Sequence, residues 1–111
     1  MEAEEIRKRF QKDVLSFNKL DPSHHNGVII GVLTYACRGD ANRKLVQKYL
    51  SGHISSKDLL PAEWWAMWNF VQPEKPVGGK WQSARGEDLA RDCNIILNAL
   101  VDQPGQTKME I

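Results

Sequence analysis

The chain has 111 residues, of which 41% are hydrophobic and 26% are charged, and its net charge is +1. This length favours a single helical domain at residues 1–102, followed by a flexible polar tail at 103–111. A net charge so close to zero argues against binding to nucleic acid or to a membrane surface through overall charge. It does not exclude a local basic patch. The acidic first residues differ from a secretory signal, and the longest apolar run, 28–33, is far too short to span a bilayer. We therefore expect a cytoplasmic protein with no contact with a membrane.

The N-terminal segment is predicted to form an amphipathic helix over residues 2–20. Leu15 lies off the apolar stripe of this helix, where it is either exposed or in contact with a neighbouring chain. Turn-forming residues at 21–27 predict a loop. Residues 28–37 hold β-branched side chains that would suit a strand, but they do not alternate and no partner strand is evident elsewhere. We therefore predict a second, buried helix at 28–37. The stripe of the first helix consists of Ile6, Phe10, Val14, Phe17 and Leu20.

The next break in the helical pattern is Arg38-Gly39-Asp40. Gly39 suits the left-handed end of one helix, and Asp40 suits the N-cap of the next, which is predicted at 41–51. A fourth helix is predicted at 61–72, because Pro61 fits a first helical position. Trp65 and Phe70 are expected to flank its inward face. That face is expected to contain Leu60, Trp64, Met67, Trp68 and Val71.

A loop rich in proline and glycine is predicted at 73–80, and Ser83 is expected to cap a last helix at 83–101. Helical segments with short connections and no evident sheet predict an all-α protein, a compact irregular or orthogonal bundle of four to five helices. The helices are expected at about 2–20, 28–37, 41–51, 61–72 and 83–101.

Few residues could carry catalysis or bind a metal. His24 and His25 are neighbours in a loop, and no further ligand stands at a recognised metal-binding spacing. The segment 78–80 (Gly-Gly-Lys) lacks the spacing of a phosphate-binding loop. Cys37 and Cys93 are expected to be buried, reduced thiols, with one disulfide between helices as the alternative. We therefore expect no enzyme activity, no metal and no cofactor; a nucleophilic Cys37 assisted by a histidine is the formal alternative.

Basic residues gather around the third helix and around the 73–82 loop, where an interleaved Trp81 could stack on an unpaired base. Residues 32–51 also resemble a helix-turn-helix superficially, and on that reading they would present Asn42, Arg43 and Gln47 to a DNA groove. An ordinary solvated face is the other interpretation. The candidate nucleic-acid-binding residues are Arg38, Arg43, Lys44, Gln47, Lys48, Lys80 and Arg85.

All four tryptophans fall within residues 60–81. So small a domain is not expected to cover all of their rings, and tryptophan is enriched at interface hot spots. We therefore expect a non-catalytic binding module, such as a small subunit or adaptor of a larger assembly. That assembly could be a nucleoprotein complex. It would bind a protein partner or a second copy through 61–81. The alternative is a direct nucleic-acid-binding regulator, of phage type or similar, that uses residues 32–51. The candidate partner-binding residues are Trp64, Trp65, Trp68, Phe70 and Trp81.

Overall fold

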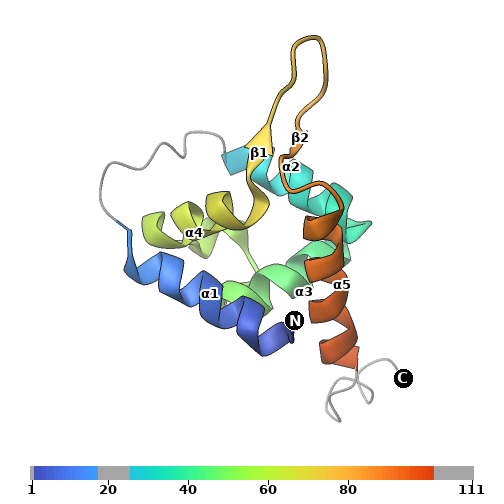
Figure 1. Ribbon diagram of the computed structural model, residues 1–111. Helices are drawn as coiled ribbons and strands as arrows, with labels where there is room; N and C mark the ends of the chain where they lie inside the picture. Colours follow the sequence, from blue (N-terminus) through green and yellow to red (C-terminus); the bar gives the residue numbers. More distant parts are fainter. Residues whose placement is uncertain (1, 18–25, 102–111) are drawn as a thin grey trace.

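The computed structural model of the protein describes residues 2–17 and 26–101 (Figure 1). Within these residues the chain forms five α-helices, one short 3-10 helix and one pair of two-residue strands. These elements are α1 (Ala3–Leu15), α2 (Asn26–Cys37), α3 (Asp40–Ser51), η1 (Ser56–Asp58), α4 (Pro61–Val71), β1 (Pro73–Glu74), β2 (Gln82–Ser83) and α5 (Glu87–Val101). The predicted all-α bundle is confirmed, and residues 28–37 are helical rather than a strand.

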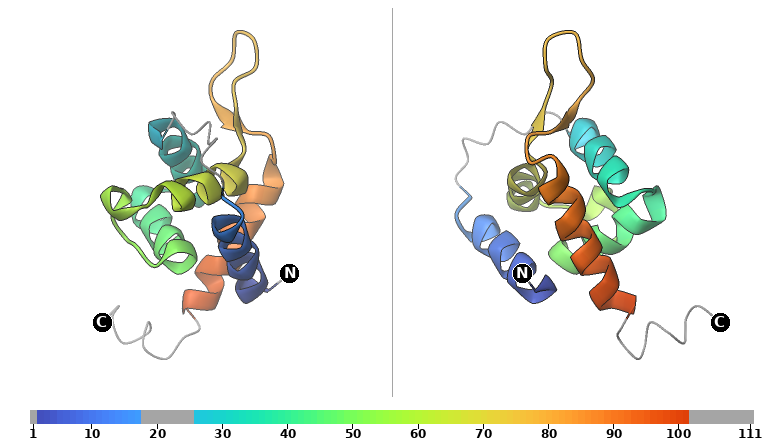
Figure 2. Two further views of the ribbon diagram at one scale, coloured as in Figure 1. Left: turned by 90° about the vertical axis from the view of Figure 1, so that its left-hand side faces the viewer. Right: turned by 45° about the vertical axis from the view of Figure 1, so that its right-hand side comes forward.

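The helices cross one another at steep angles around one interior (Figures 1 and 2). α1 packs on α3, α4 and α5, while α2 packs on the other side of the same three helices. Each helix contributes at least one apolar side chain that is almost completely buried, and removing such a side chain typically costs about 2–5 kcal/mol of stability. The central members of the core are Phe10, Leu33, Val46, Met67 and Ile96.

A β-hairpin at residues 73–83 projects away from the helices (Figures 1 and 2). Pro73 pairs with Ser83, and Glu74 pairs with Gln82, in an antiparallel register. The sequence predicted only a loop here and a helix from Ser83, so this boundary is wrong. Ser83 ends the hairpin instead, because its Oγ donates a hydrogen bond to the carbonyl of Val71 at 2.6 Å, and α5 begins only at Glu87.

The first helix is shorter than predicted, since α1 ends at Leu15. The carbonyl of Asp13 at the helix end accepts hydrogen bonds from the Ser16 hydroxyl at 2.9 Å and from the Ser16 backbone N–H at 3.1 Å. Phe17 is half-buried. Leu20, the two loop histidines and the tail expected at 103–111 lie outside the described residues.

The break between α2 and α3 lies where the sequence predicts it, but a different residue takes the left-handed conformation. Arg38 has φ of 62° and is the residue that turns the chain, while Gly39 follows with φ of 141° and stands at the N-cap of α3. The N–H of Gly39 donates to the carbonyl of Thr34, and the N–H of Arg38 donates to that of Tyr35, which together form a Schellman motif. Asp40 is therefore the first residue of α3 rather than its cap.

Candidate partner-binding surfaces

The fully buried side of α4 contains no tryptophan. Its buried residues stand three or four positions apart, so they share one side of the helix. The expected face is right for Met67 and Val71, which are buried, and wrong for Leu60, which is exposed; Trp64 and Trp68 pack against the core but are only half-buried. Phe70 is a core residue and is not available as the partner contact predicted for it. The buried residues of α4 are Glu63, Ala66, Met67, Phe70 and Val71.

Glu63 faces inward because it caps its own helix. Its Oε1 accepts a hydrogen bond from the backbone N–H of Leu60 at 2.8 Å, and its Oε2 lies 3.5 Å from Nε2 of His53. This capping arrangement sets the rotation of the first turn of α4. It leaves the Leu60 side chain 61% exposed.

All four tryptophans keep part of their surface outside the core. Trp64, Trp65 and Trp68 are half-buried, and Trp81 is 38% exposed. Nε1 of Trp65 is buried and has no hydrogen-bond acceptor among the described residues. A partly buried indole still presents a large apolar area to a partner, as interface tryptophans usually do.

The hairpin that carries Trp81 has a firm base. Besides the Ser83–Val71 bond, the N–H of Ala84 donates to the carbonyl of Gln72 at 2.7 Å. Arg85 Nη1 donates to the carbonyl of Phe70 at 2.8 Å, and its Nη2 forms an ion pair with Asp92. These bonds tie the hairpin to the end of α4 and the start of α5. At the other end of the hairpin, the side chain of Val77 is fully exposed.

Arg85 is therefore a structural residue rather than the nucleic-acid contact predicted for it. Its guanidinium group also lies over the Phe70 ring, 5.3 Å from the ring centre. Of the basic residues near the hairpin, Lys75 and Lys80 are exposed.

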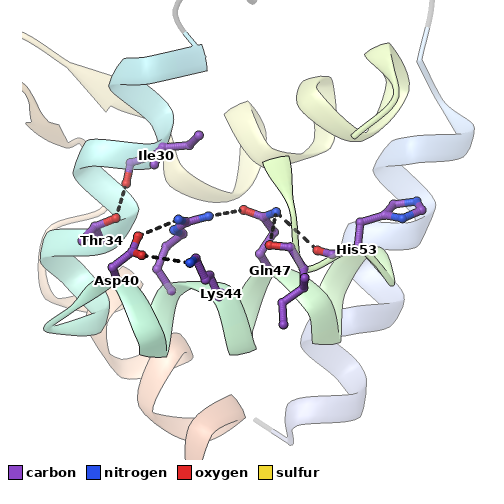
Figure 3. A network of polar contacts seen from close by, with 8 residues as sticks. Ile30, Thr34, Asp40, Lys44, Gln47 and His53 are labelled. Carbon is purple, nitrogen blue, oxygen red and sulfur yellow. Dashed lines mark hydrogen bonds and ion pairs between the residues drawn. The ribbon is translucent and has the colours of Figure 1, made fainter. Parts of the chain in front are cut away.

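The third helix holds a chain of polar contacts that runs from the exposed Asp40 to the buried Arg43 and Gln47 (Figure 3). Arg43 donates from Nη2 to Oδ1 of Asp40 at 2.6 Å and from Nη1 to Oε1 of Gln47 at 2.9 Å. Nε2 of Gln47 lies 3.3 Å from the carbonyl oxygens of His53 and of Ile54. The hydrogen bonds from Arg43 and Lys44 hold the pKa of Asp40 below its ordinary value. We name Asp40, Arg43, Gln47 and the two carbonyls the α3 polar chain.

The α3 polar chain overturns part of the nucleic-acid prediction. Arg43 and Gln47 are both buried, because their one-turn spacing turns them together toward the interior. Asn42, the third residue expected to face a DNA groove, donates instead to the carbonyl of Cys37 at 2.9 Å. The exposed basic candidates are then Arg38, Lys44, Lys48 and Lys80, which come from three separate parts of the chain.

A groove of about 920 Å³ lies between α1, the C-terminal half of α3 and the end of α5. Sequence patterns did not predict it, since its walls come from four separate segments. The one signal was Leu15, the apolar residue off the stripe of the first helix, which lies at the groove and is 87% exposed. The groove is lined by Arg7, Phe10, Gln11, Val14, Leu15, Leu45, Lys48, Tyr49, Leu50, Ser51, Gly52, Ile54, Glu63 and Leu100.

The groups that could carry chemistry are few in the described parts of the chain. Cys37 and Cys93 are free and buried, which confirms the expectation of reduced thiols. The two thiols interact, and the pKa of Cys93 is raised because its S–H donates a hydrogen bond to Cys37 and because it is buried. In residues 2–17 and 26–101 no group of three or more potential metal ligands is present. None of the helices there is long and apolar enough to cross a membrane.

Fold and surfaces together define a small all-α protein with exposed apolar residues on one hairpin and in one groove. A search with the chain matches no protein-family model, no curated protein and no solved structure.

Proposed function

We propose that this chain is a non-catalytic binding module that associates with another protein chain through residues 60–81. The observation that carries the proposal is the incomplete burial of all four tryptophans, while smaller residues fill the buried side of α4. Exposed tryptophan is costly in water and is enriched at the centres of protein interfaces. The exposed Leu60 and Val77 extend the apolar surface at the start of α4 and on the hairpin.

The hairpin is suited to this role because its position is fixed before any partner binds. Its base is tied to α4 and α5 by hydrogen bonds from Ser83, Ala84 and Arg85. A contact that is already ordered loses less conformational freedom on binding, so more of the contact energy appears as affinity.

Direct binding of nucleic acid is a second candidate, supported only by the hairpin. Lys75 and Lys80 are exposed near Trp81, and aromatic rings among cations can stack on unpaired bases. The helix-turn-helix form of this idea is not supported, because Asn42, Arg43 and Gln47 are engaged inside the protein.

The first test measures the mass of the protein in solution by light scattering, at low salt, with and without a single-stranded oligonucleotide. A photo-crosslinking residue is then placed at position 60, 77 or 81 in the source cells, with position 35 as control, because Tyr35 is 89% exposed but lies on α2. We expect either a dimer mass or one discrete cross-linked protein from positions 60, 77 and 81. Trp81→Ala should reduce that product.

The proposal fails if the protein is a monomer and positions 60, 77 and 81 give no more cross-linked product than position 35. A mass shift with the oligonucleotide that is lost in Lys75→Glu/Lys80→Glu would favour the nucleic-acid candidate instead. Thermal unfolding of each variant shows that the fold is retained.

A further inference from the structure

The groove between α1, α3 and α5 is a second surface with a distinct chemistry. Its floor contains the buried residues Phe10 and Leu50, and its edges carry Leu15 and Ile54, which are 87% and 50% exposed. Such a run of apolar residues around a concave surface typically marks a binding site. None of its lining residues belongs to the hairpin, and Glu63 is the only one from α4.

The polar groups of the groove favour a peptide over a small molecule. A small-molecule site needs several converging polar groups that orient the ligand. Here the hydroxyl of Ser51 is already used, because it donates to the carbonyl of Gln47 at 2.7 Å. Among the described lining residues the other neutral polar side chains are Gln11 and Tyr49, and the Tyr49 ring is already covered by the Arg7 guanidinium. A groove lined mainly by apolar side chains, with few neutral orienting groups, fits the apolar face of an amphipathic helix.

The charges that line the groove indicate which charge the bound helix would carry. Arg7 and Lys48 are the cations of the lining, and the Arg7 guanidinium lies over the Tyr49 ring, 4.6 Å from its centre. The single lining carboxylate, Glu63, is already occupied by the Leu60 N–H and by His53. An incoming ligand therefore meets two cations and no available anion among these residues.

From these contacts we infer that the groove binds an acidic amphipathic helix of a partner protein. Leucine-type side chains at positions i, i+3 or i+4, and i+7 of the partner occupy the floor between Phe10 and Leu50. Glutamate or aspartate beside them pairs with Arg7 and Lys48. Apart from Glu63, this surface shares no residue with 60–81, so the chain would connect two partners.

The test uses a labelled helical peptide of about 18 residues, with leucine at that spacing and glutamate on both flanks. Two controls accompany it: the same peptide with lysine for glutamate, and a shuffled peptide of the same composition. Binding is followed by fluorescence anisotropy at about 50 mM and about 300 mM salt. We expect the glutamate peptide to bind at least about tenfold more tightly than either control, and the difference to shrink at the higher salt.

Substitutions in the protein locate the site. Leu15→Ser and Ile54→Ser remove exposed apolar area without touching the core, and each should weaken the glutamate peptide by about tenfold. Arg7→Glu/Lys48→Glu should reverse the preference toward the lysine peptide. Tyr35→Ser is the matched control, since Tyr35 is 89% exposed and does not line the groove, and it should change nothing.

The inference is overturned if the glutamate and lysine peptides bind equally, or if Leu15→Ser and Tyr35→Ser have the same effect. It is also overturned if no peptide binds, including the case in which Leu15→Ser, but not Trp81→Ala, converts a dimer to a monomer and so places a second copy in the groove. Trp81→Ala should leave peptide binding unchanged, so failure of this inference and failure of the function proposed for residues 60–81 are distinguishable.

Discussion

Replacing Gln47 with methionine tests whether the α3 polar chain stabilises the fold. The two side chains have similar volume, so Gln47→Met removes hydrogen bonds without leaving a large cavity. The first loss is the acceptor for Arg43 Nη1 at 2.9 Å, a bond from a charged donor in a buried place, worth about 1.5–3 kcal/mol. The second is the Nε2 donor shared by the carbonyls of His53 and Ile54, worth about 1 kcal/mol because both distances are 3.3 Å.

A methionine side chain costs less free energy to bury than a glutamine side chain, which offsets part of the lost hydrogen-bond energy. We therefore expect the free energy of unfolding to fall by about 3 kcal/mol. For a domain of this size that corresponds to a decrease in Tm of roughly 12–24 °C. Urea denaturation followed by tryptophan fluorescence measures the free energy directly, provided that the slope with urea is unchanged.

Lys48→Met is the control, because it introduces the same side chain at the next position, which is exposed. It should alter the free energy of unfolding by no more than about 0.5 kcal/mol. If Gln47→Met costs no more than Lys48→Met, the reasoning is refuted, and Asp40 alone must be sufficient to accommodate the buried Arg43.

Four further predictions concern the helices, the thiols and the pH dependence of stability. Arg38→Gly should stabilise the protein by about 0.5–1 kcal/mol, because Arg38 holds a left-handed conformation that glycine adopts freely; a lower urea midpoint would contradict this. Gly31→Ala should also raise the midpoint, by about 0.5–1 kcal/mol, since an added Cβ meets no atom within 4 Å; a decrease would mean that the glycine is needed for packing. Cys93, whose pKa is raised by Cys37 and burial, should react with a thiol reagent only as fast as the protein unfolds, and labelling before unfolding would refute this. For the pH dependence, Asp40 has a lowered pKa in the folded state, so its stabilising contribution is complete above its ordinary value of 3.8 and is lost as the pH falls toward the folded value. The decline in urea midpoint between neutral and acidic pH should therefore be shallower in Asp40→Asn, and an unchanged decline would contradict the assignment.

The helices were predictable because each has an apolar pattern of helical period or a clear stop signal. The rotation of α4 about its own axis was not predictable. That helix is apolar on nearly every side, so its sequence pattern does not indicate which side faces the core. Capping by Glu63 and the close packing of Ala66 and Phe70 decide the orientation. The hairpin escaped prediction for another reason. Its two-residue strands depend on contacts such as the bond from Ser83 to Val71, which joins residues twelve positions apart.

The candidate sites were predictable to a similar extent. The incomplete burial of the tryptophans followed from their number in so short a segment. The burial of Arg43 and Gln47 did not, because polar side chains on a helix usually face solvent and only a network of mutual hydrogen bonds makes their burial tolerable. The groove is formed by segments distant in the sequence, so no local pattern described it.

The amide of Gln47 fixes the backbone just before η1, and that backbone carries Ile54 to the rim of the groove. The width of the groove therefore depends on the buried Gln47 side chain, which a bound ligand cannot contact. Removing these hydrogen bonds would let the side of the groove that carries Ile54 change position. The affinity for a ligand in the groove would then depend on a substitution in the interior of the protein.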